Sequence, residues 1–210
     1  MTTRFIVVRH GETEWNVQAR IQGHGDSELT GNGVAQAEAI AGRLAGERFD
    51  AIVASDLGRA LRTARCIARG HGLEIRTDAR LRERSFGVGE GLTYEEIDRQ
   101  FPDVFSRVRD TDPDAMIPGG ETRRQFHARV GDAFRWLAQS YRGRRVAVVT
   151  HGGVLSSLYR HIHAIPIERA HRIAISNASY NAVALDGAAW RIEAWDDVSH
   201  LPVAEPFDDS

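Results

Sequence analysis

The chain has 210 residues, of which 42% are hydrophobic and 27% are charged. This balance is typical of a globular protein, and a chain of this length buries enough surface to fold without a disulfide or a structural metal. Its formal net charge of −2 at pH 7 provides no global basic field. We therefore expect neither nucleic acid nor a membrane surface as a partner.

Every one of the 27 basic residues is an arginine. The composition therefore excludes a Schiff-base lysine, a pyridoxal-phosphate anchor and the lysine of a P-loop. A phosphate group bound by this chain must be held by arginine, by histidine or by backbone N–H groups.

The single cysteine, Cys66, excludes an intrachain disulfide and a cysteine-based zinc site. Because it lies on the apolar side of a helical pattern, we expect it to be buried as a small hydrophobic residue. No apolar run is long enough for a signal-peptide core or a membrane span. The expected location is the cytoplasm.

Short, fully apolar runs are typical of strands covered on both faces, and apolar residues three or four positions apart are typical of helices. In chain order the sequence predicts a strand at 5–8, a helix at 34–44, a strand at 51–54, a helix at 57–67, a weaker strand at 73–75, a helix at 126–141, a strand at 146–149, a helix at 154–162, and a hairpin of strands at 180–185 and 190–195.

Strands that alternate with helices in this way predict an α/β protein. We expect one domain over residues 1–201, with the late hairpin as an antiparallel edge. Residues 93–118 are rich in charge and proline, which predicts a helical excursion or a lid. Residues 202–210 are expected to be a loose tail.

Two of the predicted strands end in similar ways. His10 and His151 each follow an apolar run directly, and each is followed by glycine. Ligands of open parallel sheets bind beyond the carboxyl ends of the strands, and glycine allows the backbone to approach a ligand closely. One such histidine alone could be a strand-end residue satisfied by hydrogen bonds, but the matching pair favours a functional site.

The run Arg9-His10-Gly11-Glu12-Thr13-Glu14-Trp15-Asn16 resembles the RHG signature of the histidine phosphatase, or phosphoglycerate mutase-like, superfamily. Further motifs follow in the order of that family: Gln22-Gly23, Leu29-Thr30 with Gly33, Ser55-Asp56-Leu57-Gly58-Arg59-Ala60, Leu81-Arg82-Glu83-Arg84 with Gly87, and Thr150-His151-Gly152-Gly153. The resemblance covers nearly the whole chain. It implies a three-layer sandwich with a mostly parallel sheet between helices.

The resemblance also implies roles for individual residues. His10 would attack phosphorus and become phosphohistidine, a step that needs a neutral imidazole. Arg9, Arg59 and His151, the last as an imidazolium, would neutralise the charge on the phosphoryl oxygens. Contacts to phosphate or substrate are further implied for Asn16, Gln22, Gly23 and Gly152, and for the N–H group of Gly11. No metal ligand and no cofactor is implied.

Glu83 matches the general acid and base of the family, which protonates the leaving oxygen and then activates water. The alternative is a surface carboxylate paired with Arg82 or Arg84. Glu12 and Glu121 are weaker candidates for the acid, and Glu121 is expected to cap a helix or compensate its dipole. The pair Arg123-Arg124 is similar to a phosphate clamp, but at the start of an amphipathic helix we expect both side chains to be solvated.

The family contains both phosphatases and mutases. Cofactor-dependent mutases carry a long insertion between the third and fourth motifs, whereas only about 30 residues separate Gly87 from Gly119 here. We therefore expect a phosphatase that acts on small phosphorylated substrates and is most similar to the broad-specificity bacterial phosphatases. A phosphoglycerate mutase and a non-catalytic phosphate-binding module remain alternatives. The oligomeric state stays open, with a homodimer as one option.

Overall fold

A six-stranded sheet forms the centre of the protein, whose computed structural model describes residues 1–103 and 112–202. The strands are β1 (Thr2–Arg9), β2 (Ala51–Ala54), β3 (Ile75–Thr77), β4 (Arg145–Thr150), β5 (Tyr180–Asp186) and β6 (Ala189–Asp197). Their order across the sheet is β3-β2-β4-β1-β5-β6. The first four strands pair in parallel, and β5 and β6 add an antiparallel edge. The predicted α/β class and the antiparallel hairpin are confirmed.

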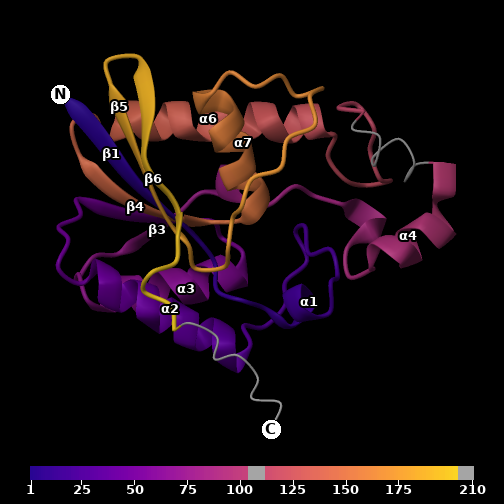
Figure 1. The fold of residues 1–210 in the computed structure, drawn as a ribbon, viewed down its shortest axis with the longest axis horizontal. Coiled ribbons are helices and arrows are strands. Elements are labelled where there is room, and N and C mark those ends of the chain that lie inside the picture. The colour runs from indigo at the N-terminus through magenta and orange to yellow at the C-terminus, as the bar shows by residue number, and fades with distance from the viewer. Residues whose placement is uncertain (104–111, 203–210) are drawn as a thin grey trace, which may run out of the picture.

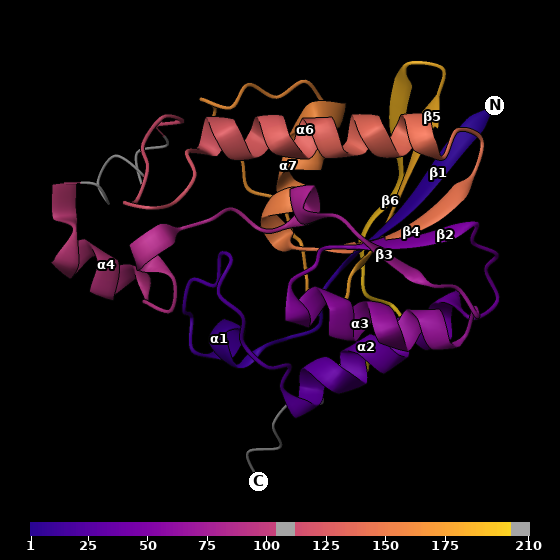
Figure 2. The same ribbon diagram turned by 180° about the vertical axis from the view of Figure 1, so that it is seen from behind.

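Helices cover both faces of this sheet (Figures 1 and 2). α6 (Arg123–Ser140) and α7 (Gly152–Ile162) lie on one face, and α2 (Gly31–Leu44) and α3 (Gly58–Arg69) lie on the other. The short helices α1 (Glu14–Val17) and α4 (Tyr94–Gln100) lie beyond one edge of these layers, and two 3₁₀ turns span Ala79–Leu81 and Gly87–Gly89. The three-layer sandwich implied by the resemblance is confirmed.

The apolar run of β1 shows why the sequence forms this sandwich. Side chains alternate between the two faces of a strand, and here both faces are covered. Phe5 and Val7 belong to the core shared with α6 and α7, whereas Ile6 and Val8 belong to the core shared with α2 and α3. All four side chains are buried, and each contributes roughly 1.5–3 kcal/mol of burial free energy.

Some local expectations are wrong. Val34, counted in the apolar stripe of the first long helix, is the fourth residue of α2 and is 47% exposed. Cys66 is only half-buried, and its Sγ lies 3.1 Å from Nη2 of Arg69. β3 begins at Ile75, the last residue of the strand expected there. Val34 and Cys66 lie on the flank of the apolar stripe of their helices, and the apolar run at 73–75 marks only the beginning of β3.

The segment 93–118 begins with α4, which packs against a small separate core formed by Ile21, Ile97 and Ile117. This confirms a helical excursion in its first part; residues 104–111 lie outside the described residues, as do residues 203–210 of the expected tail. Within the described ranges, no helix combines the length and the apolar character that a membrane crossing requires.

Candidate active site

The two histidines predicted from the strand ends lie together at the carboxyl ends of two inner strands of the sheet. β1 and β4 are neighbours, with Arg9 opposite Thr150, so the residues that follow them lie side by side. The ring centroids of His10 and His151 are 5.2 Å apart, and the ring planes are tilted by 60°. Both side chains are buried, with 3% and 0% of their surface exposed.

His10 has one ring nitrogen available for chemistry. Its Nδ1 lies 2.8 Å from the carbonyl oxygen of Gly11, and because a carbonyl oxygen only accepts, Nδ1 carries the proton and donates it. Nε2 therefore keeps its lone pair. Burial, followed by the charges of Arg59 and Arg9, holds the pKa of His10 well below its usual value. The ring is thus neutral and nucleophilic at neutral pH.

Two guanidinium groups are held rigidly at the same pocket. Arg59, the second residue of α3, donates from Nη1 and Nη2 to the carbonyl oxygens of Gly25 and Gly23 at 2.7 and 2.8 Å. Arg9 donates from Nη1 to the carbonyl oxygen of Ile175 at 2.6 Å. The Nε atoms of both arginines are buried and have no hydrogen-bond partner among the described residues. Since buried donors are normally satisfied, these N–H groups indicate a place for an anion.

His151 is the N-cap residue of α7, and its Nε2 lies 2.8 Å from the hydroxyl oxygen of Ser55. Burial, followed by the charges of Arg59, His10 and Arg9, holds the pKa of His151 well below its usual value. The expected imidazolium is therefore wrong for the ligand-free site. Its other ring nitrogen, Nδ1, is buried without a partner in the described part of the chain.

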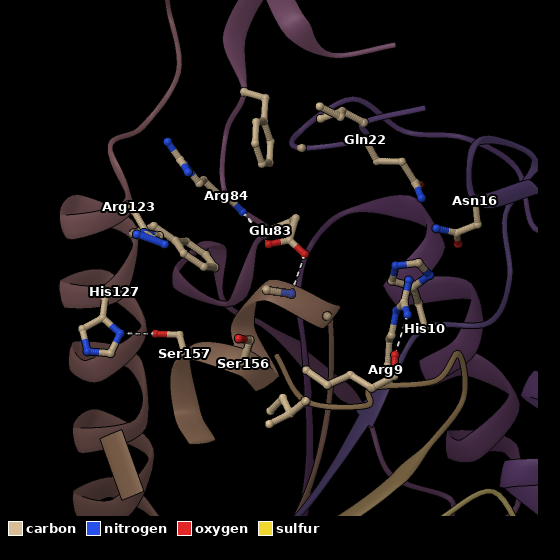
Figure 3. Close-up of a pocket in the computed structure, with 18 of the residues that line it drawn as sticks. Arg9, His10, Asn16, Gln22, Glu83, Arg84, Arg123, His127, Ser156 and Ser157 are labelled. Atoms are coloured by element: carbon tan, nitrogen blue, oxygen red, sulfur yellow. Dashed lines mark hydrogen bonds between the residues drawn. The ribbon is translucent and has the colours of Figure 1, made fainter. Parts of the chain in front are cut away.

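Glu83 lies between the two sides of the pocket (Figure 3). Its Oε2 accepts from the N–H group of Gly153, at the start of α7, and its Oε1 accepts from the N–H group of Arg84, both at 2.8 Å. The guanidinium of Arg82 pairs with Asp56 instead. Backbone groups therefore orient the Glu83 carboxylate toward the pocket. The alternative, a surface ion pair of Glu83 with Arg82 or Arg84, is wrong.

The other residues implied by the resemblance, Asn16, Gln22, Gly23 and Gly152, also line the pocket. Oδ1 of Asn16 accepts from the N–H group of Thr13 at 3.1 Å, which leaves the amide nitrogen on the side of His10 (Figure 3). Gly23 acts through Arg59, because its carbonyl oxygen accepts from that guanidinium.

One smaller expectation is wrong, and another is wrong in part. The N–H group of Gly11 donates to Oγ1 of Thr63 at 3.1 Å, so it is committed to the fold. Glu121 does not cap α6, because Thr122 is the N-cap residue, whereas its compensation of the helix dipole stays a prediction. The Glu121 carboxylate forms an ion pair with Arg129 at 2.6 Å.

The structure adds a set of pocket residues that sequence reasoning missed. Arg84, Arg123, His127, Ser157 and Arg160 line the same cavity, whose volume is about 440 Å³. In Figure 3 the first four lie on the opposite side of Glu83 from His10. The expectation of two solvated arginines at the start of α6 is therefore half right. Arg124 forms surface ion pairs with Asp114 and Glu168, whereas Arg123 lines the pocket.

The described residues contain no group of three or more His, Cys, Asp or Glu side chains placed to hold a metal ion. The donors at the pocket are instead guanidinium, imidazole and amide groups, which suit an oxyanion.

The fold and this site together define an α/β protein with an arginine-rich pocket beside a buried pair of histidines. The model of the histidine phosphatase superfamily (branch 1) matches residues 5–198, and the chain belongs to this superfamily, as its motifs predicted.

Known proteins resemble the chain over nearly its full length. The phosphoglycerate mutase-like protein 4 of Arabidopsis thaliana is 42% identical, over 93% of this chain and 86% of that protein. The metal-independent phosphoserine phosphatase of the same plant is 41% identical, over 95% and 83%. Among solved structures, YhfR of Bacillus stearothermophilus superposes with a TM-score of 0.89 at 32% identity and covers 95% of this chain and 100% of that one.

Proposed function

We propose that the protein hydrolyses phosphomonoesters of small metabolites through a phosphohistidine intermediate at His10. The observation that carries this proposal is the pair of buried donors without partners in the described residues, Nε of Arg9 and Nε of Arg59, whose side chains line the pocket that contains the free Nε2 of His10. A phosphoryl group there would satisfy both donors while it faces the nucleophile.

In the first step, Nε2 of His10 attacks phosphorus, and the bond between phosphorus and the leaving oxygen breaks. Negative charge on the phosphoryl oxygens is stabilised by Arg9 and Arg59, which are already held in place and need no reorganisation. The leaving oxygen takes a proton from Glu83, and the product alcohol departs. Because His10 is neutral before the attack, no deprotonation of the nucleophile precedes the step.

In the second step, Glu83 accepts a proton from water as the water oxygen attacks phosphohistidine. The bond between Nε2 of His10 and phosphorus breaks, and inorganic phosphate leaves the pocket. Backbone N–H groups of Arg84 and Gly153 hold the two oxygens of Glu83 in place, which supports a role for this one carboxyl group in both steps. Regeneration of neutral His10 closes the cycle.

One relative is named as phosphoglycerate mutase-like. Phosphoryl transfer to a second hydroxyl is therefore the reaction that competes with hydrolysis. The experiment measures release of inorganic phosphate from p-nitrophenyl phosphate, with and without a chelator, beside conversion of 3-phosphoglycerate in the presence of 2,3-bisphosphoglycerate. Phosphate release that withstands the chelator supports the proposal. Conversion of 3-phosphoglycerate faster than its hydrolysis contradicts it in favour of a mutase, and neither activity with retained phosphate binding would indicate a non-catalytic module.

A location in the cytoplasm stays a prediction from the sequence, and the homodimer stays one option for the assembly. Sedimentation of the purified protein across a range of concentrations determines its oligomeric state directly.

A further inference from the structure

Three guanidinium groups that no proposed step uses gather on one side of the pocket. Arg84 follows the 3₁₀ turn Ala79–Leu81, Arg123 is the first residue of α6, and Arg160 lies in the last turn of α7. All three line the cavity that contains His10. We call Arg84, Arg123 and Arg160 the far wall of the pocket.

Two of these groups are fixed in position without being neutralised. Arg84 donates from Nε and Nη2 to the carbonyl oxygens of Glu121 and Ala115, at 2.9 and 3.1 Å. Arg160 donates from Nη1 and Nη2 to two carbonyl oxygens of the loop that follows α7, at 2.8 and 2.9 Å. Carbonyl oxygens carry no formal charge, and neither arginine forms an ion pair with a described carboxylate. Both residues are also more than nine-tenths buried.

The far wall therefore concentrates positive charge in a poorly solvated place. Burial and then the charge of Arg123 lower the pKa of Arg84. Burial and then the charge of Arg160 lower the pKa of Arg123. The acidic neighbours Glu168 and Asp112 raise this pKa, each by less than Arg160 lowers it. Like charges close together in a partly buried site destabilise one another, and an anion bound between them would remove that cost.

The two anion-binding sides of the cavity lie on either side of Glu83. Figure 3 shows His10 and Arg9 on one side of its carboxylate, with Arg84 and Arg123 on the other. If Glu83 protonates the leaving oxygen, the rest of the substrate extends from that oxygen away from His10 and toward the far wall. The cavity, at about 440 Å³, has room for a small metabolite as well as its phosphoryl group.

We propose that the far wall binds a second anionic group, a carboxylate or a phosphate, carried by the leaving group of the substrate. This inference rests on the proposed function and narrows its substrate class to phosphomonoesters of small acids. Arginine forms paired hydrogen bonds with both anions. The far wall would therefore fix the position of the leaving group and also neutralise the charge of its anionic group.

The test compares three aryl substrates that differ in one substituent: phenyl phosphate, 4-carboxyphenyl phosphate and 1,4-phenylene bisphosphate. The wild-type enzyme should show a kcat/KM for at least one anionic substrate that is about tenfold or more above that for phenyl phosphate. The better of the two anionic substrates tells a carboxylate site from a phosphate site.

Variants then attribute the preference to the far wall. Arg123→Gln should lower the ratio of kcat/KM for the preferred anionic substrate to that for phenyl phosphate by about 10- to 100-fold, the effect of losing a hydrogen bond to a charged group. Intrinsic differences in leaving-group reactivity cancel when this ratio is compared between the variant and the wild type. Arg124→Gln is the matched control, because Arg124 is the neighbouring residue and forms ion pairs with Asp114 and Glu168. It should leave the ratio within about twofold.

The results separate this inference from the function on which it rests. Hydrolysis of phenyl phosphate without any preference for the anionic substrates contradicts the far-wall inference alone, and so does an equal change of the ratio in the two variants. Failure to hydrolyse all three substrates contradicts the proposed function and the inference together. The wild-type preference is measured without any variant, so the test does not depend on Arg123→Gln folding normally.

Discussion

The rings of His10 and His151 lie 5.2 Å apart at the ends of two adjacent parallel strands, and burial keeps both of them neutral. The positive charge beside these two rings therefore comes from arginine rather than from imidazolium. Arg9 and Arg59 contribute that charge, and they also lower the pKa of both histidines. In the proposed mechanism the same two guanidinium groups would hold the phosphate and keep His10 unprotonated.

Replacing Arg59 tests whether its guanidinium group supplies the positive charge that binds the phosphoryl group. Arg59→Gln should lower kcat/KM for p-nitrophenyl phosphate by about 10²–10³-fold, the usual loss for one preorganised donor. The matched control is Arg62→Gln, one turn further along α3, where the guanidinium forms ion pairs with Asp26 and Glu28. We expect less than a threefold effect there. Similar losses in both variants would mean that Arg59 acts only through the stability of α3.

Glu83→Gln keeps the size of the side chain and removes its ability to donate and accept a proton. Hydrolysis of phenyl phosphate should slow by about 10²–10⁴-fold, because phenoxide is a poor leaving group. p-Nitrophenolate leaves without a proton, so p-nitrophenyl phosphate should lose less in the first step. A rate comparison of the two substrates measures the difference.

Glu12→Gln serves as the control for Glu83. Glu12 was the other acid candidate near the nucleophile, but its Oε1 accepts from the hydroxyl of Thr30 at 2.7 Å, and it does not line the pocket. Its substitution should leave the dependence on the leaving group unchanged. Equal losses for both substrates in Glu83→Gln would instead assign the proton transfer to another group.

The histidines also predict how stability responds to acid. Folding lowers the pKa of His10 and His151 below the ordinary value and that of His127 to about 4, the last through burial and then the charges of His161 and Arg160. Between about pH 6.5 and pH 4, the unfolded chain therefore binds more protons than the native protein. The free energy of unfolding should fall as the pH falls through this window.

Urea unfolding at several pH values between 7 and 4 measures this dependence. His127→Gln removes one contributing group, so its stability should decline less steeply than that of the wild type. The exposed residue His163 provides the control, and His163→Gln should follow the wild-type curve. If His127→Gln and the wild type give parallel curves, the pKa of His127 is not lowered by folding.

The strand ends were predictable from the sequence because the signal is local. An apolar run that stops at a histidine indicates both the strand and the residue beyond its end, as His10 and His151 show. The pairing of β1 with β4, which brings the two histidines together, was not predictable in this way, because β1 and β4 are not consecutive strands. Arg59 and Glu83 needed the family resemblance, because their surroundings are rich in arginine and no spacing distinguishes them.

The far wall was not predictable, because it depends on how the elements pack. Arg123 and Arg124 are identical neighbours, and only the orientation of α6 decides which one lines the pocket. Arg160 appears in the sequence as one more charge near the end of a helix, and its burial depends on the loop that follows α7. The charge state of His151 was missed for the same reason, since burial lowers its pKa and no local pattern reports burial.

The covalent step at His10 is the centre of this account, and trapping the intermediate measures it most directly. Wild-type enzyme quenched during turnover of a ³²P-labelled substrate should carry acid-labile, base-stable label on the peptide that contains His10. His10→Ala should carry none and should have lost turnover, whereas His163→Ala should label normally. Label on another residue, or a His10→Ala variant that still labels and turns over, would contradict the proposed mechanism.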